Sequence, residues 1–500
     1  MKPYKHANKL ARFTVITAIL IFSGCAAVGP DYMPPETRVS DTWHTPMKGG
    51  LDAAPPNIRE LSQWWKTLED PVLCELIKQA IGGNLDLKEA LARVREARAS
   101  RGVASAGLFP TFGVSGQITT SKGSEETGVG TKRTLYSTGF DAGWEVDIFG
   151  GVRRTVEAAE ANLQAENASL RDVMITLTAE VAINYVEMRT YQTRLKVVAI
   201  NLITQEETHR LTEWRYQAGL SDALAVEQAR YNMENTRSQL PTLRSELTAS
   251  KNRLAVLMGK QPGEDLSLDP ETSAPIPGAP LKVVVGIPAD CIRRRPDIRQ
   301  AERDLAAQTA RIGVAEAELY PKFSLLGSIG LEALSIGGFA SSDGLTYGIG
   351  PTFSWRLFDG GAIRQNIEVQ TALQGQALAR YERTVLEALA EVENALTVYA
   401  EEQNRRAALA RAGDAARRAV TLAQKKYEAG IIDFNEVLDA QRSQLSFEDD
   451  LARSQGQVTV NLITLYKALG GGWAALGPED KKGGKTPGEQ PRTRGKPEKG

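Results

Sequence analysis

The residue with the clearest reactive role is Cys25, which follows a basic start and a short apolar run, residues 13–22. Ser23 and Gly24 are small, as a lipoprotein signal peptidase requires, and the thiol of Cys25 offers the atom to acylate. The apolar run of about ten residues is too short to span a bilayer as a folded helix. We therefore interpret residues 1–24 as a lipoprotein signal peptide and Cys25 as the lipid attachment site, with palmitate among its acyl chains.

Two features bear on that interpretation. Phe22 occupies the position where such signals usually carry leucine, so an ordinary cleaved signal with a chance cysteine is the alternative. Ala26 follows Cys25, and the aspartate that commonly retains bacterial lipoproteins at the inner membrane is therefore absent. The sequence predicts an outer-membrane location, with outer-membrane lipid as a partner.

Other reactive residue types are scattered. His6, His44 and His209 share no metal-ligand spacing. Cys74 and Cys291 are expected to be buried thiols rather than a disulfide. Asp297 follows Arg295 and Pro296, which we interpret as a helix cap rather than a catalytic group. With no nucleophile–base or metal constellation, the sequence predicts no enzyme and no cofactor. A formal net charge of −1 over 500 residues gives no indication of nucleic-acid binding.

The elements that must position these residues occur twice at a fixed spacing. Trp144 and Trp355 lie 211 positions apart, each shortly before a Gly-Gly pair. Four further pairs of segments keep this spacing: 84–87 with 295–298, 108–110 with 319–321, 216–219 with 427–430, and 254–259 with 465–470. One offset held at five sites indicates an internal duplication.

Alternating apolar and polar residues precede each of the two tryptophans. The pattern predicts strands over about 111–120 and 135–147, and again over about 323–332 and 345–358. Apolar-out, polar-in segments of about ten residues are typical of outer-membrane β-barrels. A half-buried sheet in a soluble domain is the alternative interpretation.

Four strands are too few to close a barrel, because small closed barrels begin near eight strands. A membrane sheet also cannot leave its edges unpaired. No stretch after the signal reaches 18 apolar residues, so any membrane crossing is expected from strands. The chain is therefore predicted to oligomerise in order to complete the barrel wall.

Long helical runs follow each Gly-Gly pair. The first, from about 151 to 217, spans roughly 100 Å. A returning helix to about 258 and an earlier helix over 84–108 are expected to stack end to end beside it, and the second repeat has the same plan. The predicted organisation is a lipidated extended lead (25–70), a first repeat (71–260), a Pro-rich connector or collar (261–288), a second repeat (289–472) and a disordered polar tail (473–500).

Several motifs together resemble one family. They lie at Cys25 with 29–34, at 294–302, at 355–361, and at 427–430 with 438–442. The chain is similar over nearly its whole length to the outer membrane factor family of TolC-type export ducts, in its NodT-like lipoprotein branch. The resemblance implies a mixed α and β membrane protein: a homotrimer with a 12-stranded barrel, four strands from each chain, and an α-helical barrel in the periplasm.

The resemblance also suggests roles for residues near the far ends of the helices. Members of the family close this end through acidic, basic and tyrosine side chains, and the matching positions here are Lys426, Tyr427 and Asp439. Three copies of Asp439 around a narrow aqueous neck would repel one another, so Lys426 or Tyr427 is the expected partner. Solvated helix-surface charges are the alternative.

The turns at these ends are expected to contact an adaptor. In each, Gly ends a helix in the left-handed conformation and an apolar residue follows it. The residues concerned are Gly219, Leu220 and Ser221 in the first turn, and Gly430 and Ile431 in the second. A plain helical hairpin turn is the alternative.

The predicted function is a passive, gated outer-membrane exit duct of a tripartite efflux pump. Its partners would be a periplasmic adaptor and an inner-membrane RND transporter. The same fold is compatible with the exit duct of an ABC-driven type I secretion system. A structural coiled-coil lipoprotein without a pore is the alternative of another class.

Overall fold

The structure is a computed structural model that describes residues 27–36, 39–55, 57–128, 130–264, 275–280, 282–339 and 341–473. Cys25, the signal peptide, parts of the connector and nearly all of the predicted tail lie outside the described residues. The chain forms two compact units. Unit 1 comprises Met1–Val39, Lys88–Leu170 and Arg295–Ala388; unit 2 comprises Ser40–Leu87, Arg171–Arg294 and Leu389–Gly500.

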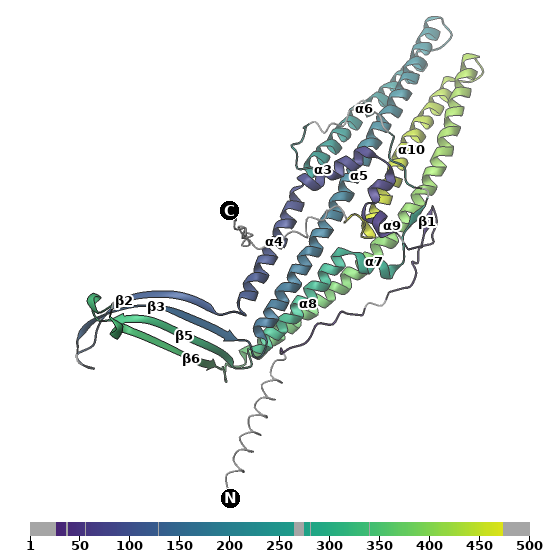
Figure 1. The fold of residues 1–500 in the computed structure, drawn as a ribbon. Helices are drawn as coiled ribbons and strands as arrows, with labels where there is room; N and C mark the ends of the chain where they lie inside the picture. Colours follow the sequence, from purple (N-terminus) through teal and green to yellow (C-terminus); the bar gives the residue numbers. More distant parts are fainter. Residues whose placement is uncertain are drawn as a thin grey trace, which may run out of the picture. The chain divides into compact units, whose positions relative to one another are not determined.

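Unit 1 contains a four-stranded antiparallel sheet with the strand order β2-β3-β5-β6 (Figure 1). The strands are β2 (Thr111–Lys122), β3 (Lys132–Val146), β5 (Lys322–Ala333) and β6 (Leu345–Ser354). Strands β3 and β5 join the two repeats, and β2 and β6 form the edges. The sequence predicted β6 to extend to residue 358, but the strand ends at Ser354.

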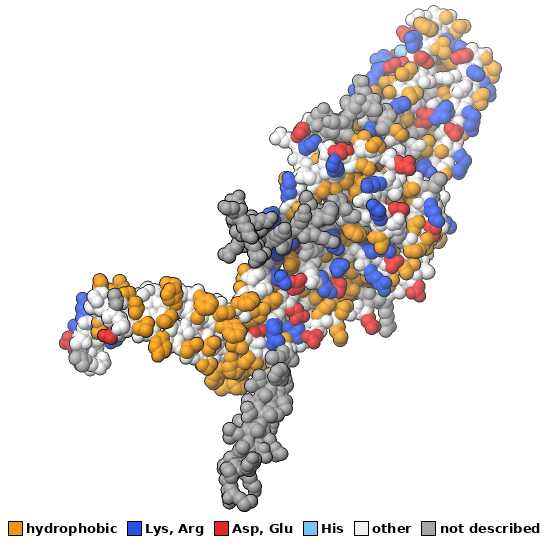
Figure 2. Space-filling model, in the orientation of Figure 1, with side chains coloured by type: hydrophobic (Ala, Val, Ile, Leu, Met, Phe, Trp, Pro, Cys, Tyr) orange, Lys and Arg blue, Asp and Glu red, His pale blue; other side chains and the backbone are white. Residues whose placement is uncertain are grey.

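The register places most of the apolar residues of the four strands on one face, with Leu135 and Leu326 on the other. One row across the sheet runs Val114, Phe140, Ile329 and Tyr347, each paired with the next. All four side chains are at least half exposed, from 52% to 80%. Hydrophobic side chains accordingly cover the strands in Figure 2. The opposite face is mostly polar, and there Ser115 donates a 2.8 Å hydrogen bond to Asp141.

Strand β6 ends early because its partner β5 begins at Lys322, which is paired with Ser354. At the junction that follows, the indole nitrogen of Trp355 donates to the carbonyl of Leu319 at 2.9 Å. The carboxylate of Asp359 then accepts the backbone N–H groups of Gly361 and Ile363, both at 2.8 Å. A side chain that accepts these otherwise unpaired N–H groups starts the next helix, α9 (Ala362–Glu428).

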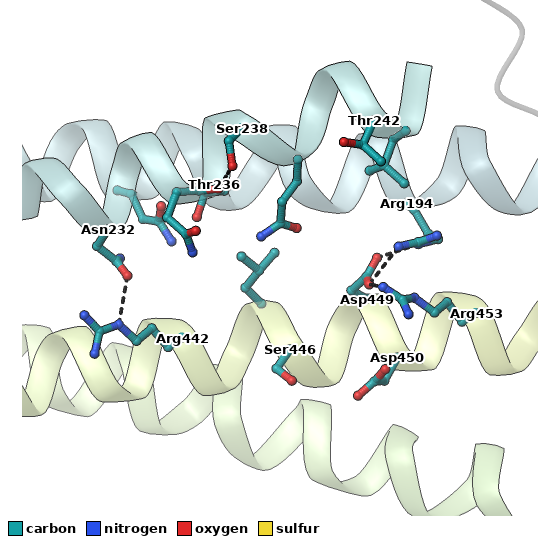
Figure 3. Close-up of a pocket in the computed structure, with 15 residues that line it drawn as sticks. Arg194, Asn232, Thr236, Ser238, Thr242, Arg442, Ser446, Asp449, Asp450 and Arg453 are labelled. Atoms are coloured by element: carbon teal, nitrogen blue, oxygen red, sulfur yellow. Dashed lines mark hydrogen bonds and ion pairs between the residues drawn. The ribbon is translucent and has the colours of Figure 1, made fainter. Parts of the chain in front are cut away.

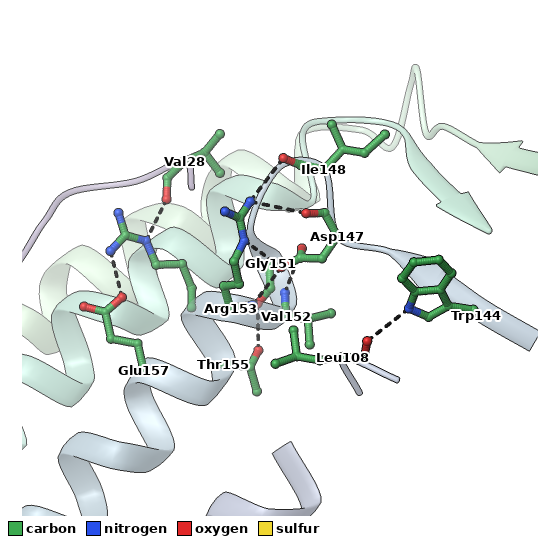
Figure 4. Close-up of polar contacts among 11 residues, drawn as sticks. Val28, Leu108, Trp144, Asp147, Ile148, Gly151, Val152, Arg153, Thr155 and Glu157 are labelled. Atoms are coloured by element: carbon green, nitrogen blue, oxygen red, sulfur yellow. Dashed lines mark hydrogen bonds and ion pairs between the residues drawn. The ribbon is translucent and has the colours of Figure 1, made fainter. Parts of the chain in front are cut away.

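The first repeat builds the same junction (Figure 4). Trp144 donates to the carbonyl of Leu108 at 3.1 Å. Asp147 accepts the backbone N–H groups of Val152 and Arg153 at 3.1 and 2.9 Å. Here the capped helix is α5 (Gly151–Gln217), which has 67 residues, as α9 does.

The remaining helices of unit 1 are α4 (Leu85–Ala106) and α8 (Pro296–Ala317). Small alanine side chains permit close packing, as where Ala161 of α5 packs with Ala306 and Ala307 of α8. Asp297 does not occupy the cap of α8. The cap residue is Arg295, whose guanidinium pairs with the Asp297 carboxylate at 2.7 Å. Asp297 lies in the first turn of α8, where its carboxylate also accepts the backbone N–H of Ile298 at 2.9 Å.

Unit 2 contains the far halves of α5 and α9 and the two helices that return beside them. These are α6 (Ala223–Leu257), which continues through Pro241, and α10 (Phe434–Ala468). The end of α6 meets the turn before α4, where the Asn84 side chain donates to the carbonyl of Leu257 at 3.0 Å.

The lead also contributes to unit 2, and it is less extended than predicted. Its strand β1 (Leu51–Asp52) pairs in parallel with β4 (Val283–Val284) of the connector. Three short elements follow: α2 (Ile58–Ser62), the 3-10 helix η1 (Trp64–Leu68) and α3 (Pro71–Gly83). Trp64 is fully buried and stacks on Tyr466 at 5.5 Å between ring centroids, so a large apolar contact fixes this part of the lead.

Three shorter segments complete the fold: α7 (Pro288–Arg294), and the 3-10 turns η2 (Ile336–Gly338) and η3 (Ser342–Gly344). Cys74 and Cys291 are both thiols, as expected, but only Cys291 is buried and Cys74 is half-buried. Within the part of the chain that the structure describes, no helix is both long and apolar enough to cross a membrane.

Candidate functional site: the tips of the helical hairpins

The first tip joins α5 to α6. Gly219 adopts φ +72°, a left-handed conformation that suits glycine, and its N–H donates to the carbonyl of Tyr216 at 2.9 Å. The N–H of Leu220 reaches back to the carbonyl of Arg215 at 2.8 Å. These bonds end α5, and they leave the Leu220 side chain 69% exposed.

The second tip joins α9 to α10 in the same way. Gly430 also has φ +72°, and the N–H of Ile431 donates to the carbonyl of Lys426 at 2.9 Å. Ile431 is 69% exposed, whereas Ile432 packs inward against a cluster that includes Phe434. Each tip therefore presents one apolar side chain beside its glycine. Ser221 of the first tip is half-buried.

Tyr427 lies in a different environment from the aqueous neck that the resemblance suggested. It is 7% exposed, packs against Phe434 at 5.2 Å between ring centroids and belongs to an apolar cluster. The guanidinium of Arg215 lies 4.6 Å from its ring centroid and donates to its backbone carbonyl at 3.4 Å. Tyr427 thus links the first repeat to the second within one chain.

Asp439 and Lys426 are exposed, and the structure does not bring them together within one copy. The Asp439 carboxylate, 75% exposed, pairs with Arg442 at 3.5 Å, one helical turn along α10. For Lys426, the described residues supply no hydrogen bond or ion pair to its ammonium group. The predicted partner of Asp439, Lys426 or Tyr427, is therefore replaced in the single chain by Arg442.

Arg442 is the residue that sequence reasoning missed at this site. Its Nε donates to Asn232 Oδ1 at 3.0 Å (Figure 3). Its guanidinium also donates to the Tyr231 hydroxyl at 2.6 Å. It therefore ties α10 to α6. The sequence could have indicated Arg442 as a partner of Asp439, because the two lie three residues apart and residues i and i+3 are neighbours on a helix.

Behind the tips, the contact between α5 and α10 combines an apolar cluster, in which Val198 packs with Leu445, with buried polar groups. Asp449 accepts two hydrogen bonds from Arg194, at 2.7 and 3.1 Å, and also pairs with Arg453 at 2.7 Å (Figure 3). Closer to the tips, the Gln441 amide donates to Thr208 at 2.8 Å. Gln205 is 2% exposed, and neither polar atom of its amide has a hydrogen-bond partner among the described residues. Buried polar contacts of this kind specify how the two helices align.

The stretch after Cys25 is held firmly in unit 1, although Cys25 itself is outside the described residues. The N–H of Val28 donates to the carbonyl of Phe149 at 3.0 Å. The side chain of Arg154, 4% exposed, donates to the carbonyl of Val28 at 3.0 Å and pairs with Asp31 at 2.8 Å. Figure 4 shows Val28 beside the start of α5. Tyr32 donates to Glu302 at 3.2 Å, and burial followed by the Glu302 charge raises the pKa of Tyr32 above its usual range.

Within the described ranges, no group of three or more His, Cys, Asp or Glu side chains is placed to bind a metal ion. The chemistry available at the tips is limited to apolar contact, ion pairing and contacts between cations and aromatic rings. Such contacts form and break without covalent change, as a gate or docking surface requires.

Comparisons with known proteins agree with this architecture. The family described as outer membrane efflux protein matches residues 76–260 and 287–471, one match in each repeat. Nodulation protein T of Rhizobium leguminosarum bv. trifolii is 33% identical over 470 residues, which cover 93% of this chain and 98% of the relative. The solvent efflux pump outer membrane protein SrpC of Pseudomonas putida is 30% identical over 467 residues, which cover 91% of this chain and 97% of that relative.

A solved structure gives the same result. The outer-membrane channel OprN matches with a TM-score of 0.84 and 36% identity, covering 90% of this chain and 100% of that one. The chain belongs to the outer membrane efflux protein family, which confirms the resemblance seen in its sequence. It is a protein of the bacterial outer membrane, and its family consists of efflux channels rather than enzymes.

Proposed function

We propose that this protein is the passive exit duct of a tripartite RND-type efflux pump, a homotrimer that conducts small molecules from the periplasm to the exterior. The observation that carries the proposal is the sheet, with one apolar face and two unpaired edges. A relative named as the outer membrane protein of a solvent efflux pump supports small molecules as the cargo.

The trimer follows from the edges of the sheet. Unpaired N–H and C=O groups along β2 and β6 are costly in hydrocarbon, where water cannot satisfy them. Pairing β6 of one copy with β2 of the next satisfies both edges. Three copies bring twelve strands, which lies within the range of closed membrane barrels.

The tips supply the gate and the docking surface. The side chains of Leu220 and Ile431, equally exposed, suit an apolar contact with a periplasmic adaptor, framed by Gly219, Ser221 and Gly430. Lys426, Tyr427 and Asp439 form the gate, in which the exposed charges of Lys426 and Asp439 meet those of other copies. Exposed ion pairs contribute about 1 kcal/mol or less each, so the binding of an adaptor can displace several of them.

Cys25 provides a second attachment to the membrane in this proposal. Acyl chains on Cys25 enter the outer membrane, and the nearby Val28 and Arg154 contacts hold the lipidated end against unit 1. The duct performs no catalysis, and the inner-membrane transporter supplies the energy.

The test combines mass with conductance. The mature lipoprotein is purified, its oligomeric mass is measured in detergent, and single-channel conductance is recorded in planar bilayers. Asp439→Ala is compared with Glu227→Ala, a matched control whose carboxylate also pairs at 3.5 Å with an arginine three residues along its helix.

We expect a trimer with a small conductance that rises in Asp439→Ala and stays unchanged in Glu227→Ala. Equal conductance in wild type and Asp439→Ala would keep the duct and remove Asp439 from the gate. A monomer without conductance would overturn the proposal and favour a structural lipoprotein.

A further inference from the structure

The internal duplication repeats individual contacts as well as whole elements. Trp144 donates to the carbonyl of Leu108, and Trp355 donates to the carbonyl of Leu319, with donor and acceptor both 211 positions further along. The strand pairing is repeated in the same way. Thr111 of β2 pairs with Gly143 of β3. The residues 211 positions later, Lys322 of β5 and Ser354 of β6, also pair. A contact in one repeat therefore predicts its counterpart in the other.

The same offset relates the two tips. The N–H of Leu220 donates to the carbonyl of Arg215, and the N–H of Ile431 donates to the carbonyl of Lys426, at 2.8 and 2.9 Å. Lys426 thus occupies in the second repeat the place that Arg215 occupies in the first. Tyr427 and Tyr216 correspond in the same way.

One contact between the repeats is made within the chain, and its counterpart is not. Arg215 of the first repeat lies over the ring of Tyr427 in the second, at 4.6 Å. The counterpart would place Lys426 of the second repeat over Tyr216 of a first repeat that follows it. No such repeat follows within one chain. Tyr216 is 49% exposed, and Lys426 is also exposed.

We propose that Lys426 lies over the ring of Tyr216 in the next copy of the trimer. This inference rests on the proposed function, because it requires copies arranged in a ring. In such a ring, first and second repeats alternate, and each boundary between copies resembles the boundary between repeats inside one copy. The residue at the gate then has an aromatic partner as well as the charge of Asp439.

The two kinds of boundary differ in strength. Inside one copy, Tyr427 is buried and Asp449 holds Arg194 by two hydrogen bonds. At the boundary between copies, the positions that correspond to Arg194 and Asp449 are Arg405 and Ser238, so the carboxylate is missing. An exposed lysine over an aromatic ring also contributes less than a desolvated arginine. The tips therefore open along the boundaries between copies, while the contact of α5 with α10 persists.

The experiment places cysteines at the predicted contact in the mature lipoprotein. Tyr216→Cys and Lys426→Cys are combined in a background of Cys74→Ser and Cys291→Ala, and a short cleavable thiol cross-linker is applied. The matched control combines Arg215→Cys with Tyr427→Cys, whose contact lies within one chain. Both test positions are exposed, so their substitution leaves the packed cluster around Tyr427 intact.

We expect covalent dimers and trimers from the test pair, and no gain in mass from the control pair. The cross-linked trimer should remain at the closed conductance until the linker is cleaved. Lys426→Ala alone should raise the open-to-closed ratio roughly tenfold, because three exposed contacts are lost. If the protein has the mass of a trimer but the test pair yields no covalent dimer, the Lys426–Tyr216 contact is overturned and the proposed duct is not. A monomer would overturn both. Unchanged gating in Lys426→Ala would overturn the opening at this boundary.

Discussion

At the scale of single residues, exposure separates the carboxylates of α10 into two kinds. Asp439 is 75% exposed and has one partner at 3.5 Å, so its ion pair contributes little to folding. Asp449 is 10% exposed and neutralises Arg194, itself 15% exposed. The Asp439 carboxylate is available to other copies of the chain. The Asp449 carboxylate holds the two repeats of one copy together.

This difference predicts the effect of Asp449→Asn. The substitution keeps the shape of the side chain but leaves Arg194 buried without a counter-charge, which should cost about 3 kcal/mol of folding stability. Asp450→Asn is the matched control, because this neighbouring carboxylate is only half-buried and should change stability by less than about 0.5 kcal/mol. Thermal unfolding followed by circular dichroism measures both. Equal midpoints for the two variants would contradict the assigned role of Asp449.

At the scale of elements, the joint between the repeats depends on two glycines. Gly139 of β3 and Gly330 of β5 are paired. A Cβ atom added at Gly330 would lie 2.5 Å from the carbonyl oxygen of Thr138, and one added at Gly139 would lie 2.9 Å from that of Ile329. Backbone atoms cannot yield as a flexible side chain can, so β3 and β5 approach closely only because these residues lack a side chain.

Gly330→Val is therefore expected to prevent the pairing of β3 with β5 and to abolish the trimer. The matched control is Gly113→Val on β2, where an added Cβ meets nothing within 4 Å. Gel filtration in detergent and resistance of the trimer to SDS without heating are the measurements. Assembly of Gly330→Val at the level of Gly113→Val would show that the close approach is dispensable.

The sequence predicted the helices and strands more readily than the contacts between them. The motif around Trp355 and its copy at Trp144 indicated strands and long helices, because periodicity and glycine pairs are local signals. The contact of Arg215 with Tyr427 and the bond from Arg442 to Asn232 join helices that lie more than 200 positions apart in the sequence. No local pattern contains that information. The spacing of 211 residues between the repeats is the exception, because it predicts contacts between copies of the chain.

At the scale of the whole molecule, the offset also specifies how two sheets join. Within one chain, Gly143 of β3 pairs with Leu326 of β5. The residue that corresponds to Gly143 in the second repeat is Ser354 of β6, 211 positions later. The residue that corresponds to Leu326 in the first repeat is Ser115 of β2, 211 positions earlier. The edge of one copy should therefore meet the edge of the next with Ser354 opposite Ser115, both on the polar face.

Ser354→Cys combined with Ser115→Cys, in the background without Cys74 and Cys291, should form disulfides that link copies into covalent dimers and trimers. The control pairs Ser354→Cys with Gly116→Cys, because a shift of one residue moves the second thiol to the opposite face of the sheet. Electrophoresis under non-reducing conditions distinguishes the two. If the control pair cross-links and the test pair does not, the register between copies differs by one residue from that inside a copy, and the repeats are not equivalent around the ring.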